Sequence, residues 1–230
     1  MRPAEGGDIA STAGVRPARA ARSATGNQQE EFSSLERVFN RNVGRERILA
    51  AAVTIVATRG FGACTVREVA QAAGIKAPGL YSHFRSKEEI LTEAVSRVLA
   101  DFTENAAAIE RGSPEEELRD TVRRHVLYQI QNVHLARVAD MLLDTASAGD
   151  FVSHDDYERL VSQQRDYLEL LGRRVATFAP TLPAPQVNVV AMAILAMCDR
   201  VAIWYDNDGP FTPDEVADLH WQLARRMVAE

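Results

Sequence analysis

The sequence has only two cysteines in 230 residues, Cys64 and Cys198, and no Cys-x-x-Cys spacing. This argues against a zinc ribbon or a disulfide-stapled fold and is typical of a reducing compartment. No secretory apolar segment follows the N-terminus, and the most apolar run, residues 187–205, is broken by Asp199 and Arg200. Each side of the break is too short to cross a bilayer. We therefore expect a cytoplasmic protein with no membrane partner.

The sequence also lacks the motifs of the common enzyme classes, because no G-x-S-x-G, P-loop or dinucleotide-binding glycine pattern is present. His125 and His134 fall on opposite faces of one predicted helix, so they cannot share a metal ion. His154-Asp155-Asp156 resembles a ligand set, but acidic residues there also suit the first turn of a helix. We expect no enzyme activity, no metal and no cofactor.

Positive charge is scarce overall, since the net charge is −6, but it is unevenly spread. Residues 44–92 contain seven Lys and Arg against four Asp and Glu, whereas residues 93–230 contain thirteen against twenty-three. The stretch 75–87 has three basic residues and no acidic one. Because binding to nucleic acid depends on the local patch and not on the total charge, this pattern predicts a basic head on a larger acidic body.

No alternating strand pattern or internal repeat is present, and the helical period predominates from residue 45, so we predict an all-α fold. Residues 1–30 are rich in small and polar residues and cannot bury enough surface to offset the cost of ordering. We assign residues 1–43 to a flexible arm, with a short helix possible within residues 31–40. The arginines at the start of this arm either contact phosphates or belong to a solvated tail: Arg16, Arg19 and Arg22.

Two helix starts frame the basic stretch. Thr65 and Ser86 are each followed three residues later by Glu, which is the capping-box pattern. Gly74 suits the left-handed turn that ends a helix, and a second short helix then carries Leu80 and Phe84. A short capped helix, a glycine turn and a second short helix form the helix-turn-helix pattern, in which the N-terminal residues of the second helix enter the major groove.

The same stretch is similar to the N-terminal domain of the tetracycline-repressor (TetR) family. The similarity rests on T-V-x-E-V-A, A-G-I, L-Y-x-H-F and S-K-E-E-I-L, and it covers about residues 45–92. It implies a DNA-binding domain at residues 44–92 and a helical effector-binding and dimerisation domain at residues 93–230. It also implies a ligand-responsive repressor that binds double-stranded operator DNA as a homodimer. The alternative is a helical adaptor or small-molecule-binding protein that kept this scaffold without binding an operator.

The resemblance also implies which residues contact DNA. Four polar residues would contact phosphates: Thr65, Tyr81, His83 and Lys87. Four residues would lie against base edges, flanked by Ser82: Lys76, Ala77, Pro78 and Gly79. Lys76 is the best candidate for donating to O6 or N7 of a guanine. A packing role for Tyr81 and a plain surface role for His83 are the alternatives.

In the body, the predicted helix 185–206 carries apolar residues over an arc too wide for one core, which favours a dimer interface shared with the helix 213–228. The ending W-Y…G-x-F-x-P-x-E-V-A is similar to a branch of the family that senses acyl-CoA thioesters, which implies an acyl-CoA or another amphipathic acid as effector. The candidate ligand-binding residues, for which core or interface packing is the alternative, are Tyr128, Arg137, Met141, Phe178, Met192, Arg200, Trp204 and Tyr205. Of these, the two arginines would anchor the anionic group.

Overall fold

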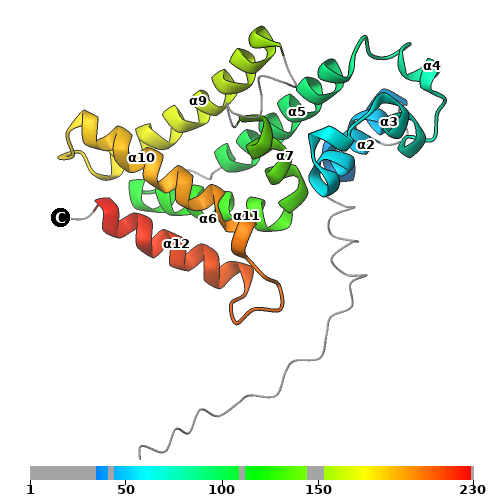
Figure 1. Ribbon diagram of the computed structural model, residues 1–230. Helices are drawn as coiled ribbons and strands as arrows, with labels where there is room; N and C mark the ends of the chain where they lie inside the picture. Colours follow the sequence, from blue (N-terminus) through cyan, green and yellow to red (C-terminus); the bar gives the residue numbers. More distant parts are fainter. Residues whose placement is uncertain (1–34, 41–43, 109–111, 144–152, 229–230) are drawn as a thin grey trace, which may run out of the picture.

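The computed structural model describes residues 35–40, 44–108, 112–143 and 153–228, and those residues form helices and connecting segments without a strand (Figure 1). The all-α prediction is confirmed. The first part of the predicted arm, with Arg16, Arg19 and Arg22, lies outside the described residues. Residues 35–38 are helical, and the side chains of Leu35 and Phe39 are buried. The short helix expected within residues 31–40 is therefore present and packs onto the head.

The head consists of four short elements: α2 (Gly44–Arg59), the 3₁₀ turn η1 (Phe61–Ala63), α3 (Val66–Ala72) and α4 (Ala77–Leu80). Gly60 and Gly74 have φ angles of 78° and 68°, in the region that favours glycine, and they close α2 and the α3 turn. The second short helix has a single turn, so Phe84 lies beyond its end. Leu80 and Phe84 are nevertheless fully buried, as their spacing predicted.

The body consists of seven helices in the described residues: α5 (Lys87–Ala107), α6 (Pro114–Gln131), α7 (Val133–Leu143), α9 (His154–Phe178), α10 (Ala184–Asp199), α11 (Val201–Trp204) and α12 (Pro213–Val228). The predicted helix 185–206 is thus interrupted at Arg200. His125 lies on α6 and His134 on α7, so they do not share one helix as the sequence analysis assumed, because α6 ends before Asn132.

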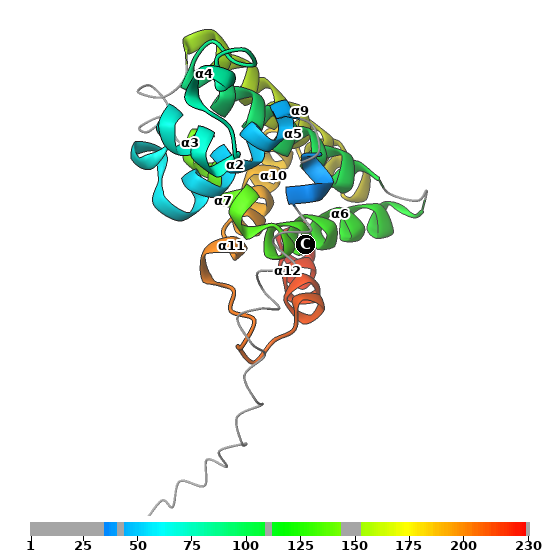
Figure 2. The same ribbon diagram turned by 90° about the vertical axis from the view of Figure 1, so that its right-hand side faces the viewer.

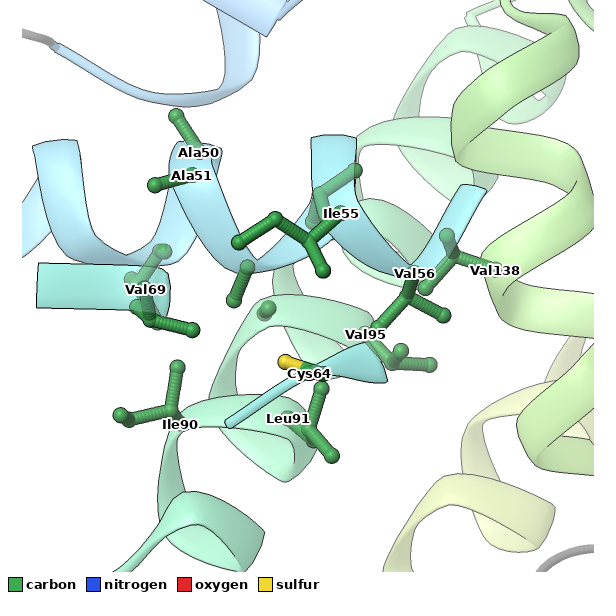
Figure 3. Packing of buried hydrophobic residues seen from close by; sticks show 14 of the residues in the cluster. Ala50, Ala51, Ile55, Val56, Cys64, Val69, Ile90, Leu91, Val95 and Val138 are labelled. Atoms are coloured by element: carbon green, nitrogen blue, oxygen red, sulfur yellow. The ribbon is translucent and has the colours of Figure 1, made fainter. Parts of the chain in front are cut away.

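Two clusters of buried apolar side chains hold the helices together. The first contains the core of the head and also side chains from α7 and Leu160 of α9. Figure 3 shows Val56 of α2, Val95 of α5 and Val138 of α7 meeting in this cluster. The second cluster joins α6 and α9 to α10, α11 and α12. α4, in the first cluster, and α12, in the second, lie far apart in both ribbon views (Figures 1 and 2). The two clusters therefore occupy different parts of the molecule.

Candidate nucleic-acid interface and ligand pocket

The tip of the head is formed by Lys76 and α4. Lys76 is extended at the N-cap, and Pro78 follows in the first turn of α4, where an N–H has no partner inside the helix. Lys76, Pro78 and Gly79 are exposed, whereas Ala77 is half-buried against the head core. A residue whose side chain packs inward can offer only its backbone to a base edge. We therefore expect the exposed residues to make the direct contacts with bases.

The residues after α4 are also exposed: Tyr81, at 58%, Ser82 and His83. Their backbone is held by Arg45 of α2, whose guanidinium donates to the backbone carbonyl of His83. The guanidinium also lies 4.0 Å from the ring centroid of Phe84 and forms an ion pair with Glu93 of α5. The end of the helix-turn-helix is therefore fastened to the helices on both sides of it, and its exposed side chains are presented on a rigid frame.

Two helix N-termini flank the tip. At α3, Thr65 Oγ1 accepts from the N–H of Glu68 at 3.2 Å, and the carboxylate of Glu68 accepts from the Thr65 N–H at 3.4 Å. The hydroxyl of Thr65, followed by its N–H and the charge of Arg59, keeps the pKa of Glu68 below its usual value. The capping box predicted from the sequence is confirmed. Its hydroxyl is engaged in capping, and a phosphate contact by Thr65 stays a prediction.

At α5, Ser86 Oγ accepts from the N–H of Glu89 at 3.1 Å. The carboxylate of Glu89 does not return to Ser86 but accepts from the N–H of Arg85 at 2.6 Å. Lys87, the first residue of α5, is half-buried and contributes a positive charge near Cys64. The N-terminus of α5 thus combines helix N–H groups with nearby basic side chains, which is the chemistry that binds a phosphate.

A pocket of about 510 Å³, including its open mouth, lies in the body between α5, α6, α7, α9 and α10. Apolar walls come from α5, with Val98, Leu99 and Phe102, and from Leu195 of α10. The polar side chains in the lining are mostly amides, carboxylates and phenols: Thr103, Tyr128, Gln129, Asp140, Gln163, Gln164, Tyr167 and Asp199.

A hydrogen-bonded network closes the inner wall of the pocket. Asp199 Oδ1 lies 2.9 Å from Nε2 of the buried His125 and accepts from Gln129 Nε2 at 3.0 Å. The other ring nitrogen of His125, Nδ1, lies 3.1 Å from the hydroxyl of Tyr167. The ring of Phe102 packs edge-on against His125 and Tyr167, with centroid distances of 4.7 Å to each. These contacts fix the polar groups by packing as well as by hydrogen bonds.

A second hydrogen-bonded network connects the pocket lining to residues outside the pocket. The hydroxyl of Tyr128, which lines the pocket, donates to Asp101 at 2.7 Å, and burial followed by this carboxylate raises its pKa well above the usual value. Asp101 also pairs with Arg37 at 2.7 Å, and Arg37 donates to Asn132 and lies over the Tyr128 ring. Arg37 belongs to the segment whose Leu35 and Phe39 pack on the head core. The pocket wall is thereby connected to the head.

Comparison with known families covers both parts of the chain. Residues 48–94 match the model of bacterial regulatory proteins of the tetR family, and residues 111–228 match the model of the tetracyclin repressor-like C-terminal domain. The chain belongs to the TetR family. It is a DNA-binding transcriptional regulator and not an enzyme, as the sequence predicted. Among the described residues, no group of three or more His, Cys, Asp or Glu side chains is placed to hold a metal ion.

Individual TetR-family relatives support the assignment. The chain is 29% identical over 192 residues to the transcriptional repressor KstR2 of Mycolicibacterium smegmatis, covering 76% of this chain and 86% of that protein. It is 25% identical to the transcriptional activator FasR of the same organism over 80% of this chain and 82% of that protein. A tetR-family regulator from Rhodococcus RHA1 has the same fold, with a TM-score of 0.71, 23% identity and coverage of 81% of this chain and 97% of that one. The structure of AibR with isovaleryl coenzyme A and operator DNA superposes with a TM-score of 0.68 at 20% identity, over 79% of this chain and 97% of that one.

Of the ligand-binding residues predicted for this TetR-family regulator, Tyr128 lines the pocket. The side chain of Met141 lies outside the described residues. Phe178 packs edge-on against Trp221, 6.1 Å between centroids, within the second apolar cluster. Arg137 is exposed and is not part of the lining.

The other predicted ligand residues of the regulator lie on α10 and α11 or just after them. Met192 and Trp204 are more than half exposed, and the Tyr205 hydroxyl donates weakly to the carbonyl of Phe211 at 3.4 Å. Arg200 is exposed, and its charge opposes the rise in the pKa of Asp140. These four residues do not line the pocket.

Sequence reasoning missed the polar lining of the pocket, namely Gln129, Asp140, Gln163, Tyr167 and Asp199. His125 and Gln129 are four residues apart on α6, and this spacing was the only local sign that both face inward. The remaining lining residues come from three other helices, so no local pattern joins them.

Proposed function

We propose that this regulator is a cytoplasmic repressor that binds its operator as a homodimer and leaves it when a small effector occupies the body pocket. The observation that carries this proposal is the separation of three surfaces on one chain. α4, at the basic tip, and the last helix, α12, lie far apart (Figure 1). Large apolar side chains are exposed on the last helices, and the pocket is lined by α5, α6, α7, α9 and α10.

The apolar face supports the homodimer. One side of α10 is buried within the chain, with Val187, Ala191 and Ile194. The large apolar side chains that the described residues expose all belong to the last helices and the loop before α12, apart from Tyr81: Val189, Met192, Ile203, Trp204, Phe211, Leu219, Leu223 and Met227. This concentration of exposed apolar side chains in one part of the chain supports a protein interface.

The composition of this region agrees with an interface. The segment Ala184–Trp204 is long and apolar enough, by length and composition, to cross a membrane, yet only 33% of its most apolar window is buried in the chain. α10 and α12 pack against each other and against α6 in the second cluster, so one copy presents a firm surface to the other. We infer a two-fold interface in which both helices of one chain face those of its partner.

Helix α5 supports the coupling between effector and DNA. Its N-terminal half contributes Ile90 and Leu91 to the head core, and its later turns contribute Val98 and Phe102 to the pocket. A ligand that presses on Phe102 therefore acts on a helix that carries the head. A switch requires that the effector bind the DNA-releasing conformation more tightly than the DNA-bound one.

The class of effector is open between two candidates. One similar structure, AibR, contains isovaleryl coenzyme A, and another is the ketosteroid transcriptional regulator KstR2 of Mycobacterium tuberculosis. On the first of these similarities we propose acyl-CoA thioesters as the first ligands to screen for release of DNA. The described lining of the pocket, in contrast, offers no Lys or Arg to an acidic group, which favours a ligand without a carboxylate.

The test of the homodimer is Met192→Glu, measured by sedimentation equilibrium and by fluorescence anisotropy with upstream DNA. Met192 is 57% exposed, and full burial of a methionine stabilises by about 1.5–3 kcal/mol, so two copies of this site contribute roughly 2–3 kcal/mol to the dimer. The dimer dissociation constant should rise by at least about 30-fold. DNA affinity should fall with it.

Tyr81→Ala is the matched control, because Tyr81 is equally exposed but lies on the tip. This variant should lose DNA affinity and keep the dimer constant of the parent. An unchanged dimer constant in Met192→Glu would rule out the α10 face as the interface, and a parent that binds no upstream DNA would favour the adaptor alternative.

A further inference from the structure

Two glutamines of the pocket lining have buried side-chain amide oxygens that receive no hydrogen bond from the described residues. The side-chain amide nitrogen of Gln129 must face Asp199, because a carboxylate only accepts hydrogen bonds. Its amide oxygen is thereby directed away, and this atom is buried and has no partner. The amide oxygen of Gln163 on α9 is also buried and unpartnered. Both residues line the pocket, and Gln129 is only 6% exposed.

The phenol donors of the lining are already in use. In the tautomer that carries the proton on Nε2, facing Asp199, Nδ1 of His125 accepts from the hydroxyl of Tyr167. The hydroxyl of Tyr128 donates to Asp101 outside the pocket. Neither tyrosine therefore has a proton left for a ligand.

The charges in the lining are negative. Asp140 and Asp199 both contribute carboxylates, and no lysine or arginine is found among the described lining residues. Burial, followed by the charge of Asp199, raises the pKa of Asp140 to about 6. The charge of Asp199 therefore acts on Asp140 across this part of the pocket, and Arg200 and His125 oppose it only in part.

We propose that the pocket binds an apolar molecule whose polar end is a hydrogen-bond donor, an alcohol or a protonated amine, in preference to a carboxylate. Such a donor satisfies the buried amide oxygens of Gln129 and Gln163 and, as an ammonium group, offsets the charge of Asp140. A carboxylate brings neither a donor nor a favourable charge. The inference rests on the proposed function only in treating this pocket as the effector site.

The test uses three probes with the same eight-carbon chain: 1-octanol, octylamine and octanoate. Binding to the full-length protein is measured by titration calorimetry at neutral pH, below the concentration at which each probe aggregates. We expect octanol and octylamine to bind at least about tenfold more tightly than octanoate. Equal or tighter binding of octanoate, or no binding of any probe at millimolar concentration, would overturn the inference.

Asp140→Asn distinguishes binding of the amine in the pocket from binding to the acidic surface of the protein, which also attracts amines. The structure gives Asp140 no hydrogen bond or ion pair with the other described residues, so the amide should fold like the parent. This variant should bind octylamine roughly tenfold more weakly than the parent and bind octanol with unchanged affinity. The matched control is Asp166→Asn, an exposed residue of α9 outside the lining, which should bind all three probes like the parent. Equal loss of octylamine in both variants would place the amine on the surface and contradict the proposal.

A last measurement distinguishes this inference from the proposed function. The probe that binds most tightly is added to the complex of the regulator with DNA. Release of DNA supports both the ligand class and the effector role of the pocket. Binding to the pocket without release keeps the ligand class and refutes the effector role, whereas release by octanoate alone refutes the ligand class and keeps the effector role.

Discussion

Gly79→Ala is expected to stabilise the protein while weakening its binding to DNA. Gly79 lies in α4 and does not have a positive φ, and a Cβ built on it meets no atom within 4 Å. Alanine favours a helix over glycine by up to about 1 kcal/mol, and we take roughly 0.5–1 kcal/mol for this single turn. For a chain of this length, the melting temperature should rise by about 1–4 °C.

The same substitution should be unfavourable for DNA binding. Gly79 is exposed at the tip beside Lys76 and Pro78, where the new methyl group would occupy space needed for close approach to base edges. We expect operator affinity to fall by about tenfold or more, a loss of ~1.4 kcal/mol. Differential scanning fluorimetry gives the stability, and fluorescence anisotropy with operator DNA gives the affinity.

Gly172→Ala is the control for this pair of effects. Gly172 lies within α9, and a Cβ there also meets no atom within 4 Å, so the substitution should stabilise to a similar extent without changing DNA affinity. If Gly79→Ala binds operator as tightly as the parent, the backbone of the tip does not approach the bases and the proposed readout is wrong.

Three further perturbations follow from the structure. Lys76→Ala should reduce the discrimination between bases at one position per half-site by about 1–3 kcal/mol. Lys87→Ala should weaken binding to all DNA sequences and flatten the salt dependence of that binding. Salt slopes and base preferences identical to those of the parent would contradict these roles. Arg37→Ala should lower the free energy of unfolding by roughly 1–2 kcal/mol, because Asp101, whose side chain is 18% exposed, loses its cation; an unchanged urea midpoint would count against this. The pKa of Asp140 is about 6 in the fold against 3.8 as a model value, so above about pH 6 the folded state bears a penalty that disappears as the pH falls toward 4. Asp140→Asn should therefore be more stable than the parent at pH 8, by about 1–3 kcal/mol, with the difference closing at acid pH in urea titrations.

The helix starts were predictable because their chemistry is local. Like Thr65, Ser113 and Thr212 form reciprocal hydrogen bonds with the glutamates three residues later, a spacing that can be read from the sequence. At Ser86 only half of the pattern is present, since the carboxylate of Glu89 turns to the N–H of Arg85. Which of two neighbouring N–H donors the carboxylate of Glu89 accepts from depends on the path of the chain before the helix, which no four-residue motif records.

The partner-facing side of α10 was not predictable from periodicity. Ala191 and Ile194 are buried in their own chain, whereas Val189 and Met192 are exposed, although all four belong to one apolar arc. The pattern showed that the arc is wide, but only the packing of α6 and α9 shows which half is left for a partner. The acidic pocket lining was missed for the same reason, because its members meet only after five helices have packed.

The first apolar cluster has a consequence for building hybrid regulators. The family match to the head ends at residue 94, but Val138 of α7 lies in the same core as Val56 and Val95 (Figure 3), and Leu160 of α9 belongs to it too. A head transplanted at that border would leave seven of the cluster's 28 described buried side chains behind, and its valines would face an unrelated surface. Exchange of DNA specificity should therefore succeed by grafting only the exposed residues of the tip, while a joint placed at the border should yield a chain that must be repacked at α7 before it folds.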